Sequence, residues 1–168
     1  MAGGVILGID PGLKGAIAFL RGSEVITYMM PVLKAKRGQM LDEGTLARMI
    51  DANSRDIEFA VLEAQWARPT DGGPQAFKTG MNFGSLRMVL AANFIPYQII
   101  SPVRWKRFLG VTSDKDSSRA LANQLFPRSA DQWRLRTHEG RAEAALLAHY
   151  GVKHPIRAES EDAQAEGC

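Results

Sequence analysis

The chain of 168 residues is long enough for one domain with a sizeable core, and its 45% hydrophobic content is typical of a globular protein. The single cysteine, Cys168, excludes an internal disulfide and a cysteine-rich zinc site, and the net charge of +3 is too small to identify a partner. No apolar segment approaches the roughly 20 residues of a membrane span, and the N-terminus lacks the features of a signal peptide. We therefore expect a cytoplasmic protein without membrane association.

The first half of the chain predicts three strands in a meander, then a helix and a fourth strand. Leu46, Met49 and Ile50 have the spacing of a helix face turned toward a core, and Asp42 is placed to cap that helix. Proline and glycine residues between 66 and 75 predict a mobile loop. The strands are expected at residues 5–9, 15–20, 24–29 and 59–62, with an irregular basic segment at 31–39.

The second half predicts one more strand and four helices. The apolar periodicity of 76–93 indicates a helix that is interrupted or begins again near Gly80 and Gly84. A strand at 97–100 precedes a helix from Ser101-Pro102 to Gly110, and Ser113 with Asp116 resembles a capping box for a helix that ends at Phe126. The last helix is expected at about 138–150, with Gly151 as its stop. This order predicts an α/β fold, a five-stranded mixed sheet flanked by helices over residues 1–151, followed by a polar, disordered tail at 152–168.

Acidic residues stand at the ends of two predicted strands. Asp10 follows the strand at 5–9 and Glu63 follows the strand at 59–62, and sites form at such strand ends in open α/β sheets. Glu139 and Glu143 are four residues apart and share one face of the final helix, where they repel each other unless a cation compensates. The apolar run at 144–148 favours a helix packed against the sheet, whereas two solvent-facing glutamates partnered by arginines remain the alternative.

These four acids predict a site for a hard cation. Oxygen ligands without cysteine or paired histidines favour Mg²⁺ or Mn²⁺. Two such ions about 4 Å apart could activate a water and stabilise the leaving oxygen of a phosphodiester. Between residues 102 and 136, eight basic residues stand against three acids, which suits a polyanion such as nucleic acid, although a solvated helix surface is the alternative.

Four motifs resemble, in the same order, those of the RuvC family of Holliday junction resolvases, and most of all its compact phage and prophage branch. The motifs are Gly8-Ile9-Asp10-Pro11-Gly12, Val61-Leu62-Glu63, Pro102-Val103-Arg104-Trp105-Lys106 and the segment 140–148. The resemblance covers about residues 4–151. It implies an RNase H-like fold, a homodimer, and the cutting of symmetric strands at a four-way DNA junction by two metal ions.

The resemblance also assigns roles to individual acids. Asp10 and Glu63 match the metal ligands of two strands, and Glu143 matches the acid within the last helix. Glu139 stands where the pattern has aspartate or histidine, so its extra methylene could shift one metal, and the adjacent His138 could assist it or be a surface residue.

Further residues are candidates for binding DNA or a second subunit. Lys106 and Lys115 could contact phosphates near the cut, and Trp66 could stack on an unpaired base or cover the sheet edge. Trp105 reads first as a packing residue. The helix at 76–93 is core by default, but the resemblance implies that it also forms the dimer interface. The DNA-binding candidates are Arg104, Lys106, Arg107, Lys115, Arg119 and Trp66, and the dimer candidates are Phe77, Met81, Leu86 and Val89.

Three other functions are weighed against this interpretation. Sugar kinases and actin-like ATPases also begin with a strand, an acid and a glycine turn, but they need two such domains and a second glycine-rich phosphate loop. A nuclease of the same superfamily acting on forks, flaps or RNA is a nearer alternative. The departure at Glu139 also permits a junction-binding protein with an impaired catalytic site.

Overall fold

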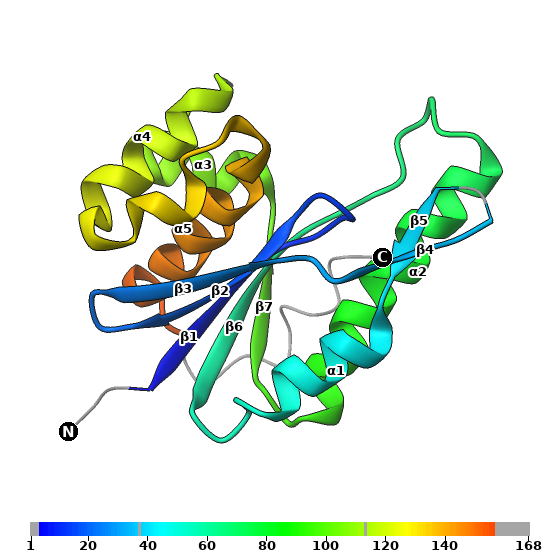
Figure 1. Cartoon of the computed structure of the whole chain (residues 1–168), viewed down its shortest axis with the longest axis horizontal. Coiled ribbons are helices and arrows are strands. Elements are labelled where there is room, and N and C mark those ends of the chain that lie inside the picture. The colour runs from blue at the N-terminus through cyan, green and yellow to red at the C-terminus, as the bar shows by residue number, and fades with distance from the viewer. Residues whose placement is uncertain (1–3, 37, 113, 157–168) are drawn as a thin grey trace.

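A computed structural model describes residues 4–36, 38–112 and 114–156, with the side chain of Lys115 excepted. A five-stranded sheet separates two layers of helices, with α1 and α2 on one face and α3, α4 and α5 on the other (Figure 1). The strands of this sheet are β1 (Val5–Asp10), β2 (Ala16–Arg21), β3 (Glu24–Met29), β6 (Ile57–Glu63) and β7 (Tyr97–Ile100). The helices are α1 (Glu43–Asp51), α2 (Gly73–Ala92), α3 (Pro102–Leu109), α4 (Lys115–Leu125) and α5 (Glu139–Lys153), with 3₁₀ turns at Pro127–Trp133 and Arg136–His138.

The sheet is mixed, as predicted, with the order β3-β2-β1-β6-β7. β1 pairs antiparallel with β2 but parallel with β6, and β6 pairs parallel with β7. Ile9 lies opposite Leu62 in the parallel pair. The residues that follow them, Asp10 and Glu63, are therefore neighbours at the same edge of the sheet.

Helix α5 lies unusually close to the central strand. A Cβ atom on Gly8 would come within 2.0 Å of the Ala144 carbonyl oxygen and 2.5 Å of the Ala148 nitrogen, so only glycine permits this contact. The predicted stop at Gly151 is wrong, because α5 continues to Lys153. Gly151 is instead a contact residue, since a Cβ there would lie 2.8–3.0 Å from side chains of β1 and β6.

Local signals placed several helix ends correctly. Asp42 caps α1 by accepting a hydrogen bond from the Thr45 backbone N–H at 2.9 Å. Ser101 caps α3, and Gly110 ends it in the left-handed conformation at φ 71°. The cap of α4 is Asp114, which accepts from the Asp116 N–H, rather than the predicted Ser113, which lies outside the described residues.

Two predictions about chain organisation need correction. The segment expected to be irregular forms a two-stranded ribbon of β4 (Val32–Lys34) and β5 (Gln39–Leu41). Helix α2 runs unbroken through Gly80 and Gly84, because burial of its apolar face offsets the weak helix propensity of glycine, about 1 kcal/mol for each residue.

None of the helices within the described ranges is long and apolar enough to cross a membrane. Of the expected tail, residues 152–153 belong to α5, and residues 157–168 lie outside the described part of the chain.

Candidate active site

The acids predicted from the sequence converge on one edge of the sheet. Asp10 and Glu63 end the parallel neighbours β1 and β6. The first turn of α5 touches the same edge, because a Cβ on Gly140 would lie 2.9 Å from Asp10 Oδ2. This contact brings Glu139 and Glu143, which flank Gly140 on the helix, beside Asp10. Their spacing predicts a shared face of α5, and in the structure both side chains line the same cleft as Asp10.

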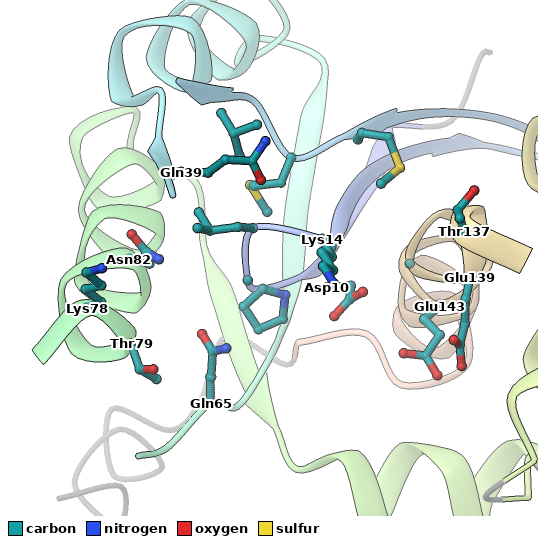
Figure 2. Close-up of a pocket in the computed structure, with 18 of the residues that line it drawn as sticks. Asp10, Lys14, Gln39, Gln65, Lys78, Thr79, Asn82, Thr137, Glu139 and Glu143 are labelled. Carbon is teal, nitrogen blue, oxygen red and sulfur yellow. The ribbon is translucent and has the colours of Figure 1, made fainter. Parts of the chain in front are cut away.

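Asp10, Glu139 and Glu143 line a single cleft with a volume of about 1260 Å³. Figure 2 shows Asp10 between two walls, with Glu139 and Glu143 on one side and Lys78, Thr79 and Asn82 of α2 on the other. Gln39 of the β4–β5 ribbon continues the α2 wall, and Lys106, Arg119 and Arg136 add positive charge on the side of α5. Pockets for small ligands occupy roughly 300–1,000 Å³. A cleft of this size fits an extended substrate.

The acids perturb one another strongly. Burial raises the pKa of Asp10 well above its ordinary value, and the negative charges of Glu143 and Glu63 raise it further. The charge of Glu139 acts in the same direction, whereas Lys106 opposes it. Each of the other three acids is thus close enough to Asp10 to resist its ionisation, and perturbed carboxylates of this kind mark the cluster as a candidate functional site.

Glu63 is held by an unexpected partner. Trp105 is fully buried, and its indole Nε1–H donates a hydrogen bond of 2.6 Å to Glu63 Oε2. Burial raises the pKa of Glu63 and the charge of Glu143 adds to the rise, while the hydrogen bond from Trp105 lowers it. The sequence alone predicts only a packing role for Trp105. The missed signal is chemical, since a buried indole N–H usually finds an acceptor.

Glu143 is also held by two other side chains. Its Oε1 accepts from Lys106 Nζ at 2.6 Å and from Ser118 Oγ at 3.0 Å, and its side chain is only 12% exposed. Burial alone would lower the pKa of Lys106, but the hydrogen bond to Glu143 and the neighbouring acids raise it. Glu143 is therefore no solvent-facing residue partnered by an arginine. Ser118, which is buried on α4, was not identified from the sequence.

The donor set can be tested against the predicted metal. All four side chains offer oxygen, which Mg²⁺ and Mn²⁺ prefer. Among the residues that the structure describes, however, no three acids, histidines or cysteines already have the spacing of a formed metal site. The ammonium of Lys106 neutralises Glu143 in this arrangement. The oxygen donors therefore suit a hard divalent cation in their chemistry, whereas the described acids, with Glu143 paired to Lys106, do not have the arrangement of a formed metal site.

The predicted DNA-binding residues divide into two groups. Lys106 and Arg119 line the cleft, and Arg119 also pairs with Asp116 at 2.5 Å. Arg104 and Arg107 are exposed on α3 outside the cleft lining, and Trp66 is 61% exposed in the loop after β6. The backbone of Lys115 begins α4, but its side chain lies outside the described part of the structure.

His138, considered as an assistant to Glu139, ends a 3₁₀ turn and does not line the cleft. Its Nδ1 is buried without a hydrogen-bond partner among the described residues. Nothing in its position gives it a role beside the acids.

The four residues predicted for the dimer interface differ in how far their side chains are exposed. Phe77 is 68% exposed and Met81 is 49% exposed. Leu86 and Val89 are 1% and 9% exposed, because they pack α2 against its own sheet and α1, so their side chains leave little surface for a second subunit. Met88 on the same helix, which the sequence analysis does not include, is 66% exposed.

The sheet order, the flanking helices and the acids at the strand ends define an RNase H-like α/β protein, as the sequence predicts. Its fold is that of RuvC-type resolvases. RuvC from T. thermophilus, in complex with a Holliday junction substrate, matches over 89% of this chain and 94% of its own, with a TM-score of 0.58 and 16% identity. Ydc2, the yeast mitochondrial Holliday junction resolvase, matches over 85% and 75% respectively, with a TM-score of 0.52 and 17% identity.

No family model matches the chain, and no curated protein matches it in sequence.

Proposed function

We propose that this protein is a RuvC-type endonuclease that cuts four-way and related branched DNA, in recombination or in the processing of phage DNA. The observation that carries the proposal is the meeting of Asp10, Glu63 and Glu143 at one edge of the sheet, in a fold shared with two Holliday junction resolvases. The sequence motifs that surround these acids support the same assignment.

The proposed chemistry is phosphodiester hydrolysis assisted by two divalent cations, Mg²⁺ or Mn²⁺. Asp10, Glu63, Glu139 and Glu143 would hold them, and the cations would activate water and stabilise the leaving oxygen. The chain's own contribution is placement. Trp105 orients Glu63, Ser118 orients Glu143, and Lys106 can turn from Glu143 to a phosphate of the bound strand.

Branched DNA is the proposed substrate, and basic side chains around the acids would hold its backbone. Lys106 and Arg119 line the cleft with the acids. Arg104, Arg107, Lys115 and Trp66 would act on DNA that extends beyond the cleft. Contacts of this kind neutralise phosphates and fix the position of the substrate.

We also propose that the enzyme is a C2 homodimer, because two symmetric cuts require two sites. Phe77, Met81 and Met88 are exposed and lie four and seven residues apart, so they share one side of α2. Gly80 and Gly84, around which a Cβ would meet nothing within 4 Å, would let a second helix approach closely on that side.

The test is a nuclease assay on four-way, forked, flapped and linear DNA and on an RNA hairpin, with Mg²⁺, Mn²⁺ or a chelator. We expect metal-dependent cutting of the four-way junction above all. Metal-dependent cutting by Asp10→Asn would contradict the proposed site. Tight junction binding without cutting would instead support the second candidate, a junction-binding protein with an impaired catalytic site, which the glutamate at position 139 permits.

A further inference from the structure

The β4–β5 ribbon stands apart from the five-stranded sheet. Val32 pairs with Leu41, Leu33 with Met40 and Lys34 with Gln39, and the Ala35 N–H closes the turn on the Gly38 carbonyl at 3.0 Å. A lone two-stranded ribbon is marginally stable in water. The ribbon lies beside α2 (Figure 1) and is held to the core through buried Leu41, while Val32, Gly38 and Gln39 line the cleft.

The two faces of the ribbon differ in direction and chemistry. Side chains alternate along a strand, so Val32 and Lys34 share a face with Gln39. Val32 and Gln39 line the cleft, and Figure 2 shows Gln39 at its edge. Lys34 therefore lies on the same face of the ribbon as these two cleft-lining residues.

Charge indicates what the ribbon binds. Lys34 and Lys36 are exposed, and neither ammonium has an ion pair or hydrogen bond among the described residues. Lys34 lies opposite Gln39 in the ribbon, and Lys36 lies in the connection between β4 and β5, so both lysines are close in the chain to the cleft-lining residues Gly38 and Gln39. Gln39 adds an amide, which can donate to a phosphate oxygen.

We propose that the β4–β5 ribbon binds the sugar-phosphate backbone of the duplex arm that leaves the cleft, through Lys34 and Lys36. This inference rests on the proposed function, since it requires DNA in the cleft. The ribbon forms part of the cleft wall opposite α5, so a duplex arm bound there would contact the protein on both sides of the acids. The contact is to phosphates and carries no sequence preference.

The test is the salt dependence of binding to a labelled four-way junction and to linear duplex, in chelator so that no cutting occurs. Each phosphate neutralised contributes a slope of about −0.9 in a plot of log affinity against log salt. The double variant Lys34→Ala/Lys36→Ala should therefore make the slope of log affinity against log salt shallower by about 2. At 0.1 M salt, binding should weaken about tenfold for each lysine removed. The loss should be equal for two junctions of unrelated sequence, and Lys34→Arg/Lys36→Arg should restore affinity.

The matched control is Lys153→Ala. This lysine is equally exposed, but it lies at the far end of α5, about 20 Å along the helix from Glu139. Its removal should leave affinity and slope unchanged. Parental affinity and slope in the double alanine variant would overturn the inference while leaving the nuclease assignment intact. A parent that binds no branched DNA would overturn the proposed function and this inference together.

Discussion

Replacing Trp105 by phenylalanine separates its packing from its hydrogen bond. The variant keeps a buried aromatic ring but loses the N–H that donates to Glu63 Oε2 at 2.6 Å. A hydrogen bond to a charged group contributes about 1.5–3 kcal/mol. If that energy fixes Glu63 in its working orientation, the single-turnover cutting rate should fall by about 10- to 100-fold, since each 1.36 kcal/mol is tenfold in rate.

The pH profile distinguishes this positioning role from a general loss of structure. The hydrogen bond from Trp105 lowers the pKa of Glu63 against the effect of burial, so its loss should raise that pKa. Because the working carboxylate is ionised, the acidic limb of the rate profile should move to higher pH. Rates at alkaline pH should recover part of the deficit.

Trp133 supplies the matched control. It is 1% exposed, and its Nε1–H donates to Asn123 Oδ1 at 2.8 Å, away from the acids. Trp133→Phe should lower the melting temperature without moving the pH profile of cutting. If Trp105→Phe cuts at the parental rate at every pH, or if both variants lose activity only in proportion to stability, the positioning argument is wrong.

Five further variants test the site and its support. Asp10→Asn should abolish cutting, retain junction binding and raise the melting temperature of the metal-free protein at pH 7. The folded pKa of Asp10 is raised, so its ionisation opposes folding as pH rises, and the gain should vanish below about pH 4 in thermal scans. If Glu139 is a ligand, single-turnover assays should show that Glu139→Asp cuts faster than the parent and Glu139→Gln cuts more slowly. If Glu139→Gln keeps the parental rate, Glu139 is not a ligand. Gly8→Ala should destabilise by about 1–3 kcal/mol in denaturant melts, because its Cβ meets the α5 backbone, whereas Gly73→Ala at the start of α2, where the added Cβ meets nothing within 4 Å, should stabilise.

The acids could be predicted because their placement depends on short-range signals and one rule of topology. The apolar runs before Asp10 and Glu63 define strands, and parallel neighbours bring their carboxyl ends together. Glu139 and Glu143 share a face through spacing alone. Likewise the ends of α1 and α3 follow from residues next to them, so no distant contact is needed to place them.

The side chains that hold the acids could not be predicted in the same way. Trp105 and Glu63 are 42 residues apart, Lys106 and Glu143 are 37 apart, and Ser118 and Glu143 are 25 apart. Nothing local distinguishes a buried tryptophan that only packs from one that also donates to a carboxylate. Only the fold determines which of these two roles a buried tryptophan has, because α3 and α4 bring their donors to the acids from other parts of the chain.

The same distinction explains Gly151 and the β4–β5 ribbon. A glycine after an apolar helical run indicates a stop when only the chain is considered, yet Gly151 is required by the side chains of β1 and β6 that press against α5. The ribbon has weak strand signals, and its pairing depends on a turn at Ala35 and Gly38. In both cases the deciding contact is tertiary.

The electrostatics of the cleft link its stability to its proposed chemistry. Four acids gathered at one sheet edge repel one another, and the pKa of Asp10 is raised first by its burial and then by the charges of its acidic neighbours. Lys106 offsets part of it by pairing with Glu143, with Ser118 satisfying the same oxygen. A divalent cation would offset more, because it brings two charges into the space between the carboxylates. The arrangement that opposes folding in the metal-free chain is therefore the one that favours cation binding, as expected where a site is maintained for function rather than for stability.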